Sequence, residues 1–286
     1  MNQNEFLDEI LTAIRSLGIT EGDRVYIASD VTGFLFRGAR LCGARTATEQ
    51  DYLLQGLLDR LKVLAGKKGT LLIPMYSWTF CKGIAFDVRT TPSEVGSLGN
   101  YALSHDPAFR RTWHPIYSFL VAGADRELLL KMKNEDSWGK DSPFGYLHQN
   151  KGKMLLFDVK PSQCNTFEHY VEQCIGVPYR YHKEFIGDYR DENGTESRRA
   201  CRMFVRDLSV ISAASETNDI FYLENQVMKE TECRGIGLGI LDLSASFPLI
   251  AKDLLTNNGR NIYRFENYEI DWTIAQTHPD ERKVRD

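Results

Sequence analysis

Two apolar stretches, GDRVYIASD (residues 22–30) and GTLLIPMYS (residues 69–77), decide the fold. Each is typical of a short buried strand, and the segment between them places leucines at helical spacing from Thr48 to Leu64. Two strands joined by one helix form a βαβ unit, in which the strands pair in parallel within a sheet covered on both faces. We therefore expect an α/β protein with three α/β/α layers and a mostly parallel central sheet.

Similar patterns continue along the rest of the chain. The opening segment predicts an amphipathic helix, with Phe6, Ile10 and Ile14 on one face and Gly18 as its stop. We also expect strands at 118–122 and 154–157, helices at 126–132, 166–174 and 220–230, and a strand, loop and helix from 235 to 258. In the last segment GIGLG (235–239) lacks the spacing of a nucleotide-binding loop, so a strand is the favoured interpretation.

A polar region at 181–208 interrupts this alternation. Turn-forming residues at 191–194 separate two segments of strand character, which is the pattern of a β-hairpin. The chain has no linker rich in proline, serine or glycine, and it has no internal repeat. We therefore expect a single domain over residues 1–286, with an antiparallel hairpin insertion around 181–208.

Composition and charge argue against several classes of protein. The formal net charge of −4 is unsuited to nucleic acid or an anionic membrane as the main partner. No segment has the roughly 18 apolar residues of a membrane span, and the N-terminus does not resemble a signal peptide. The cysteines are scattered without a CxxC pair, so we expect reduced thiols, a cytoplasmic location and no bound metal. They are Cys42, Cys81, Cys164, Cys174, Cys201 and Cys233.

The segment NTFEHYVE (165–172) carries the strongest candidates for chemistry. If it opens a helix with Asn165 or Thr166 as its N-cap, His169 and Glu172 lie three residues apart on one face. A carboxylate beside an imidazole fixes the tautomer of the ring and makes it a stronger general base. Such a pair on a helix is more often an exposed polar pair, so the spacing leaves both interpretations open.

Two further segments could hold functional groups. In RRTWHPIYSFLVAG (110–123), His114 stands at the entry to a strand and could act as a base or fix a turn by hydrogen bonds. In FDVRTTPSEVG (86–96), Ser93 is placed to cap a helix, whose free backbone N–H groups could bind an anion. A capped helix without any ligand is the simpler interpretation of this second segment.

Taken in order, these segments resemble the aminoglycoside 3-N-acetyltransferase family, also called the antibiotic N-acetyltransferase family. The resemblance extends from about residue 22 to residue 181. NTFEHYVE is similar to the NTxxHxxE pattern of that family, and RTWHPIYS (111–118) to its RSxHPxxS pattern. It also includes GTLLIPMYSW (69–78), TPSEVG (91–96) and SPFGYL (142–147). The resemblance implies an enzyme that transfers an acyl group from acetyl-CoA, or another acyl-CoA, to an amine.

The resemblance also implies roles for individual positions. His169 would be the general base, and Glu172 would orient it and stabilise its protonated form. The amine would attack the thioester directly, in a ternary complex and without an acyl-enzyme. The residues implied to hold the acyl-CoA are Ser93, Gly96, His114, Ser118 and Thr166.

The sequence departs from the family pattern at Thr112, which replaces a serine, at residues 167–168 and beyond residue 181. Phe167 stands where a small serine is usual and Glu168 follows it, so the wall and charge of the pocket are expected to differ. Beyond residue 181 the resemblance is loose, and this part commonly shapes the acceptor site. There Arg198, Arg199 and Arg202 would suit a diphosphate, although a solvated strand face explains them equally well.

These observations favour an acceptor that is an amino sugar linked to a nucleotide. The alternative acceptor is an aminoglycoside antibiotic acetylated at its 3-amino group, which would confer resistance. Two other hypotheses remain open: Cys164, five residues before His169, could form an acyl-enzyme, or the chain could bind CoA without catalysis. Whether the protein forms a homodimer is left open by the sequence.

Overall fold

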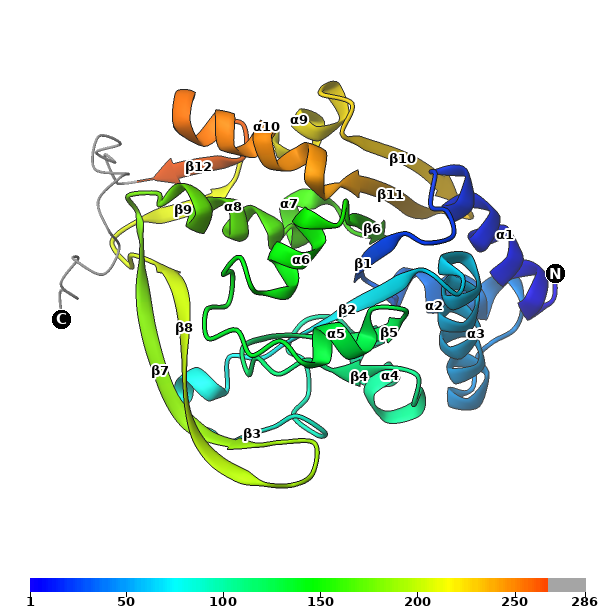
Figure 1. The fold of residues 1–286 in the computed structure, drawn as a ribbon. Helices are drawn as coiled ribbons and strands as arrows, with labels where there is room; N and C mark the ends of the chain where they lie inside the picture. Colours follow the sequence, from blue (N-terminus) through cyan, green and yellow to red (C-terminus); the bar gives the residue numbers. More distant parts are fainter. Residues whose placement is uncertain (267–286) are drawn as a thin grey trace.

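A computed structural model describes residues 1–266, and residues 267–286 lie outside the described part of the chain. The expected single domain over residues 1–286 extends beyond these limits and stays a prediction. Figure 1 shows a central sheet with helices on both sides and a long hairpin that extends away from them.

The central sheet of the described part has seven strands. In spatial order they are β10 (Met228–Cys233), β11 (Ile236–Asp242), β6 (Lys153–Phe157), β1 (Arg24–Ser29), β2 (Thr70–Tyr76), β5 (Tyr117–Gly123) and β4 (Arg110–Arg111). β6, β1 and β2 pair in parallel, and this is the predicted βαβ unit extended by one strand. β11 and β5 run in the opposite direction to the other strands, so the pairings toward both edges are antiparallel.

Each central strand buries side chains on both faces, which explains its continuous apolar sequence. In β1, Val25 and Ile27 join one core cluster while Tyr26 and Ala28 join the other. The first cluster is covered by α1 (Gln3–Ser16), α2 (Thr32–Leu41), α3 (Ala47–Ala65) and α4 (Ser97–His105). The second is covered by α5 (Arg126–Leu130), α6 (Pro143–Gln149), α8 (Phe167–Ile175), α9 (Asn218–Glu224) and α10 (Leu243–Thr256). The predicted α/β/α layers are therefore confirmed.

Three details differ from the expectations. α2 was not expected, and the helix expected at 220–230 ends with α9 at Glu224, after which the chain forms β10. The helix expected to begin near Ser93 begins at Ser97. In the first two cases short segments adopt regular structure because they pack on the sheet, α2 through Phe34 against Phe157 and β10 by pairing with β11, which local sequence patterns do not report.

The polar region expected to form a hairpin does so. β7 (Arg180–Arg190) and β8 (Glu196–Arg206) pair antiparallel along their whole length, and β3 (Phe86–Asp87) adds a short third strand. At the base of the hairpin, where its two strands join the rest of the protein, Arg180 and Phe204 are buried. Farther toward the turn, Cys201 and Tyr189 are buried instead. The hairpin thus presents opposite faces to the protein at its two ends. A separate pair, β9 (Ile211–Ala214) and β12 (Tyr263–Glu266), follows it.

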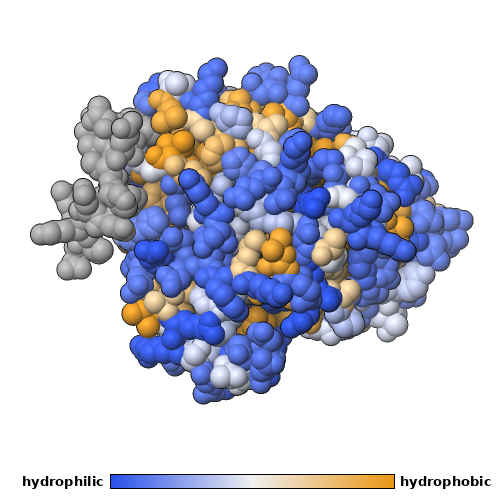
Figure 2. Space-filling model, in the orientation of Figure 1, coloured by the Kyte–Doolittle hydropathy of each residue, from blue (hydrophilic) through white to orange (hydrophobic). Residues whose placement is uncertain are grey.

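The surface is hydrophilic over most of the face in Figure 2, and the apolar side chains form small separate patches. None of the helices within residues 1–266 combines the length and apolar character needed to cross a membrane.

Candidate active site

The site lies where the parallel strands end. After β6 the chain forms a short helix, α7 (Pro161–Cys164), and then α8, which carries His169 and Glu172. α8 ends at Gly176, whose positive φ of 73° turns the chain back toward the helix. This turn brings the segment before β7 against the face of α8 that bears the pair.

Glu172 is completely buried and has a partner for each carboxylate oxygen. Tyr179 donates a hydrogen bond of 2.6 Å to Oε1, and Oε2 forms an ion pair of 2.8 Å with Nε of Arg180. Burial alone would raise the pKa of Glu172, but the charge of Arg180 and the contact with His169 lower it to about 2. The carboxylate is therefore ionised at neutral pH.

His169 is held by this carboxylate. Its Nδ1 lies 2.7 Å from Oε2 of Glu172 and 3.0 Å from Nη2 of Arg180. Because an ionised carboxylate accepts while a guanidinium only donates, the proton on Nδ1 is assigned to the bond with Glu172, which leaves Nε2 as the acceptor. Burial, and then the charge of Arg180, lower the pKa of His169 below its usual value, so the ring is neutral at neutral pH.

A cavity of about 340 Å³ opens beside the imidazole of His169. Its wall is largely apolar and aromatic, and no Asp, Glu, Lys or Arg side chain lines it. Thr166 and Gly96, two of the residues expected to hold acyl-CoA, do line this cavity. Among the described residues, no group of three or more His, Cys, Asp or Glu side chains could hold a metal ion.

His114 and Ser118, also expected to hold acyl-CoA, are completely buried and do not line this cavity. Nδ1 of His114 accepts hydrogen bonds from the backbone N–H groups of Ile116 and Tyr117, and burial lowers its pKa to about 4. The ring therefore fixes the turn into β5 as a neutral acceptor. This was the simpler of the two interpretations left open by the sequence.

Ser118 is a partner of Arg111, the first residue of the RTWHPIYS segment. Nε of Arg111 donates to Oγ of Ser118 at 2.8 Å, and Nη2 donates to the backbone oxygen of Met75 at 2.8 Å. The third contact of the guanidinium is with the backbone oxygen of Thr91. All three acceptors are uncharged, and burial lowers the pKa of Arg111 to about 9. The arginine and serine of this pattern thus join three segments of chain, and neither lines the cavity beside His169.

Ser93 is not the cap of a helix. Its hydroxyl donates to the backbone oxygen of Val95, and its backbone N–H donates to the side chain of Asn100. The loop continues to Gly96, which has a positive φ of 67° and precedes the first residue of α4. The prediction was wrong because the four residues 93–96 form a loop between Pro92 and the first residue of the helix.

The hairpin arginines do not gather at one place. Arg202 pairs with Asp136 at 3.0 Å, and the exposed Arg198 lies 3.7 Å from Asp188. The guanidinium of Arg199 lies over the rings of Trp113 and Tyr189, at 4.9 and 4.3 Å from their centroids. None of the three lines the cavity beside His169.

Phe167 and Glu168, which depart from the family pattern, both point away from this cavity. Phe167 is buried and packs on Tyr170, at 5.2 Å between ring centroids. Glu168 is buried and accepts a hydrogen bond of 2.7 Å from Tyr222, while burial raises its pKa to about 7. The expectation that they alter the wall of the pocket is therefore wrong for their side chains.

Several side chains of the site were missed by the sequence analysis. Tyr179 and Arg180 complete the environment of Glu172, and Trp138 packs edge-on against His169 at 5.2 Å between ring centroids. Tyr26 and Tyr76 line the cavity, and their hydroxyl oxygens lie 3.1 Å apart. The signal available for Tyr26 and Tyr76 was their position near the ends of two adjacent parallel strands, where α/β proteins place their ligands.

Comparison with known proteins gives the family. The sequence pattern of the family described as aminoglycoside 3-N-acetyltransferase matches residues 44–247. This chain belongs to that family. No curated protein sequence matches it. Family membership confirms the prediction of an acyl-CoA-dependent N-acetyltransferase with acetyl-CoA as its co-substrate.

Solved structures similar to this N-acetyltransferase show the same fold at low sequence identity. Aminoglycoside acetyltransferase AAC(3)-Xa is 20% identical, with a TM-score of 0.68 over 88% of this chain and 94% of its own. AAC-IIIb in a binary complex with CoASH is 17% identical, with a TM-score of 0.68 over 90% and 97% of the chains. Sisomicin-bound AAC-VIa is 18% identical, with a TM-score of 0.66 over 90% and 98%.

The electrostatics of the site predict how His169 titrates. Arg180 lowers the pKa of His169, so replacing it by glutamine should raise the pKa of the imidazole. The titration of His169 followed by NMR should therefore move to higher pH in the Arg180→Gln variant. Arg198→Gln is the matched control, since Arg198 is exposed and pairs with Asp188, and it should leave the titration unchanged. An unchanged or lowered pKa in Arg180→Gln would contradict this account.

Proposed function

We propose that this protein transfers an acyl group from acyl-CoA directly to the amine of an amino sugar, with His169 as general base. The observation that carries the proposal is the 2.7 Å contact between Nδ1 of His169 and the buried, ionised Glu172 at the edge of a cavity. A neutral imidazole with a fixed tautomer and a free Nε2 meets the requirements of a general base near neutral pH.

The reaction can be written with every proton placed. The amine nitrogen attacks the thioester carbonyl carbon, and Nε2 of His169 takes a proton from that nitrogen as the N–C bond forms. Glu172 stabilises the resulting imidazolium through Nδ1. The tetrahedral intermediate then breaks its C–S bond, and the proton on His169 passes to the departing CoA sulfur. No bond forms between the acyl group and the protein.

The negative charge on the carbonyl oxygen needs hydrogen-bond donors, and the cavity offers neutral ones. Tyr26 and Tyr76 are within hydrogen-bond distance of each other, so one phenol donates to the other and the second retains a proton for a ligand. Burial raises the pKa of both phenols well above the usual value, which keeps them protonated. Thr166 lies beside both hydroxyls, so these three side chains are proposed to stabilise the oxyanion.

The proposed acceptor is an amino sugar linked to a nucleoside diphosphate. A polycationic aminoglycoside would be attracted by carboxylates, and the cavity beside His169 has no acidic residue on its wall. The three hairpin arginines proposed from sequence do not form a diphosphate site at that cavity, because Arg198 and Arg202 face carboxylates and Arg199 lies over Trp113. The support for this acceptor therefore comes from the absence of acidic lining.

The acceptor is tested by thiol release from acetyl-CoA with a panel of amino sugars. We expect CoA release with nucleotide-linked amino sugars and none with aminoglycosides. Heat-inactivated protein, with each acceptor, is the control for spontaneous thioester hydrolysis. Release with an aminoglycoside alone would overturn the proposed acceptor in favour of the resistance function.

The base is tested by replacing His169. His169→Ala should lower kcat by about 10²- to 10⁴-fold, the usual contribution of a general base. Cys164 also lines the cavity, but its thiol donates to the backbone oxygen of Lys160 and burial raises its pKa, so Cys164→Ala is the control and should retain activity. Loss of all transfer in Cys164→Ala would replace direct transfer by an acyl-enzyme mechanism, and unchanged activity in His169→Ala would remove His169 from the role of base.

The oxyanion donors are tested by removing one phenol. Tyr76→Phe should lower kcat by roughly 10-fold or more, with a smaller effect on KM for acetyl-CoA, because the lost bond acts mainly in the transition state. Tyr170→Phe removes a half-buried hydroxyl that bonds His148 outside the cavity, and it should leave kcat unchanged. Equal effects of the two substitutions would show a loss of packing rather than of an oxyanion donor.

A further inference from the structure

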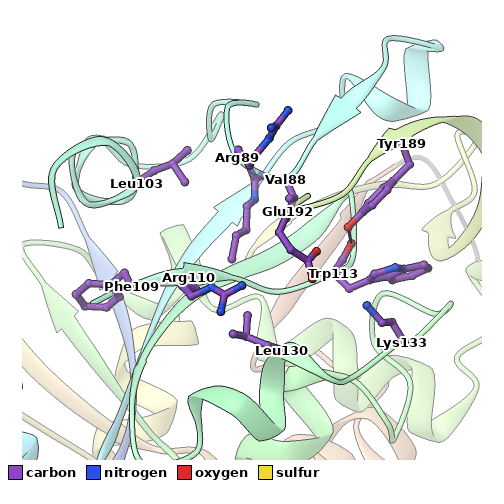
Figure 3. A pocket seen from close by; sticks show the side chains of 11 residues that line it. Val88, Arg89, Leu103, Phe109, Arg110, Trp113, Leu130, Lys133, Tyr189 and Glu192 are labelled. Carbon is purple, nitrogen blue, oxygen red and sulfur yellow. Dashed lines mark hydrogen bonds between the residues drawn. The ribbon is translucent and has the colours of Figure 1, made fainter. Parts of the chain in front are cut away.

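A second cavity, of about 220 Å³, lies outside the site of His169. It is formed by β4 and the residues after it, by the segment that follows α5, and by the end of the β7–β8 hairpin (Figure 3). It shares no lining residue with the cavity beside His169. In Figure 3 the polar ends of Arg110, Lys133 and Glu192 point toward the centre of this cavity.

Four cationic side chains line this second cavity, and two of them, Arg89 and Arg111, already have hydrogen-bond partners. Arg89 makes two hydrogen bonds to the carboxylate of Asp87, at 3.0 and 2.7 Å, and Arg111 is buried with its three uncharged acceptors. Arg110 and Lys133 have no carboxylate partner within 4.0 Å in residues 1–266. Two cations are thus free to bind an anion, against one acidic lining residue, Glu192.

A third cation, Arg199, does not line this cavity itself but stacks on two aromatic rings that do. Arg199 lies over both Trp113 and Tyr189, which line the cavity, and Lys133 lies 5.9 Å from the ring centroid of Trp113. Nε of Arg199 donates to Ser197, and no carboxylate within the described residues lies within 4.0 Å of its guanidinium. Stacking fixes the position of the guanidinium without neutralising it, which leaves its remaining N–H groups able to bind an anion.

We propose that this second cavity binds the phosphoryl groups of a nucleotide-bearing substrate through Arg110 and Lys133, with the positive charge of Arg199 against its aromatic wall. Charge-assisted hydrogen bonds from arginine and lysine are the usual means by which proteins bind phosphate oxygens. The nucleotide belongs either to the acyl-CoA or to the nucleotide-linked acceptor. The inference rests on the proposed function because that acceptor is one of its two sources of phosphate. Both carry phosphoryl groups on a nucleoside.

The position of the cavity relative to the base is compatible with either source. Trp113 is adjacent to His114, whose Nε2 lies 3.5 Å from Oγ of Ser137, and the next residue, Trp138, packs on His169. Apart from His169 these residues are buried, so a layer of packed side chains separates the two cavities. A nucleotide substrate extends over many atoms from its reacting group, so its phosphates bind away from the base.

The first experiment measures binding of inorganic pyrophosphate by calorimetry at low ionic strength. We expect the parent protein to bind it and the Arg110→Gln/Lys133→Met variant to bind at least about 10-fold more weakly, because two charged donors are lost. Glu192→Gln should bind more tightly, because a like charge is removed. Arg198→Gln, which removes one positive charge outside the cavity, should bind as the parent does.

Three results of this experiment would overturn the proposal. Absence of pyrophosphate binding by the parent protein would overturn it, and so would equal binding by the double variant. Equal weakening in Arg198→Gln would also overturn it, because the effect would then reflect net charge alone.

The second experiment identifies the source of the phosphate, using UDP and adenosine 3′,5′-bisphosphate as probes. Weaker binding of UDP to the double variant, with a raised KM for the acceptor, assigns the cavity to the acceptor. Weaker binding of the bisphosphate, with a raised KM for acetyl-CoA, assigns it to the co-substrate. Either result supports the cavity as a phosphoryl site, and unchanged affinity for both probes overturns it.

Failure of this inference can be told apart from failure of the proposed function. Binding is measured without acyl transfer, so the effects of the variants on pyrophosphate are independent of the acceptor. Acyl transfer to a nucleotide-linked sugar with unchanged KM values in the double variant would reject the cavity and keep the function. Pyrophosphate binding lost in the double variant, with transfer to aminoglycosides alone, would keep the cavity and reject the proposed acceptor.

Discussion

The burial of Glu172 is the constraint on which the site depends. Removing a carboxylate from water costs several kcal/mol unless charges and hydrogen bonds replace the solvent, so the fold must bring partners to it. Tyr179, Arg180 and His169 supply them from two directions. Two of these partners come from the chain that follows α8, so the turn at Gly176 is as necessary to the site as the helix itself.

The same interaction joins the hairpin to the catalytic layer. Arg180 is the first residue of β7, and its Nη1 donates to the backbone oxygen of Phe204 on β8 while its Nε faces Glu172. One guanidinium therefore connects α8 to both strands of the hairpin. The same hairpin forms one side of the second cavity near its turn, through Tyr189 and Glu192.

The sequence allowed prediction of those features that are encoded locally. Apolar runs located the central strands, turn residues located the hairpin, and a three-residue spacing paired His169 with Glu172. The direction of β5 and β11 was not accessible, because an apolar run is the same in parallel and antiparallel strands. Arg180 was missed for a related reason: its partner is set by how the chain reverses after a helix, which no periodicity reports.

Two histidines show why a sequence pattern alone cannot assign a catalytic role. Burial lowers the pKa of both His114 and His169, so both rings are neutral near pH 7. Nδ1 of His114 already accepts two backbone N–H groups, and its side chain has no exposed surface. His169 instead donates from Nδ1 to a carboxylate and borders a cavity, so its other nitrogen is available to a substrate. The partner of each ring, rather than its pKa, separates the histidine that holds a turn from the one that can accept a proton.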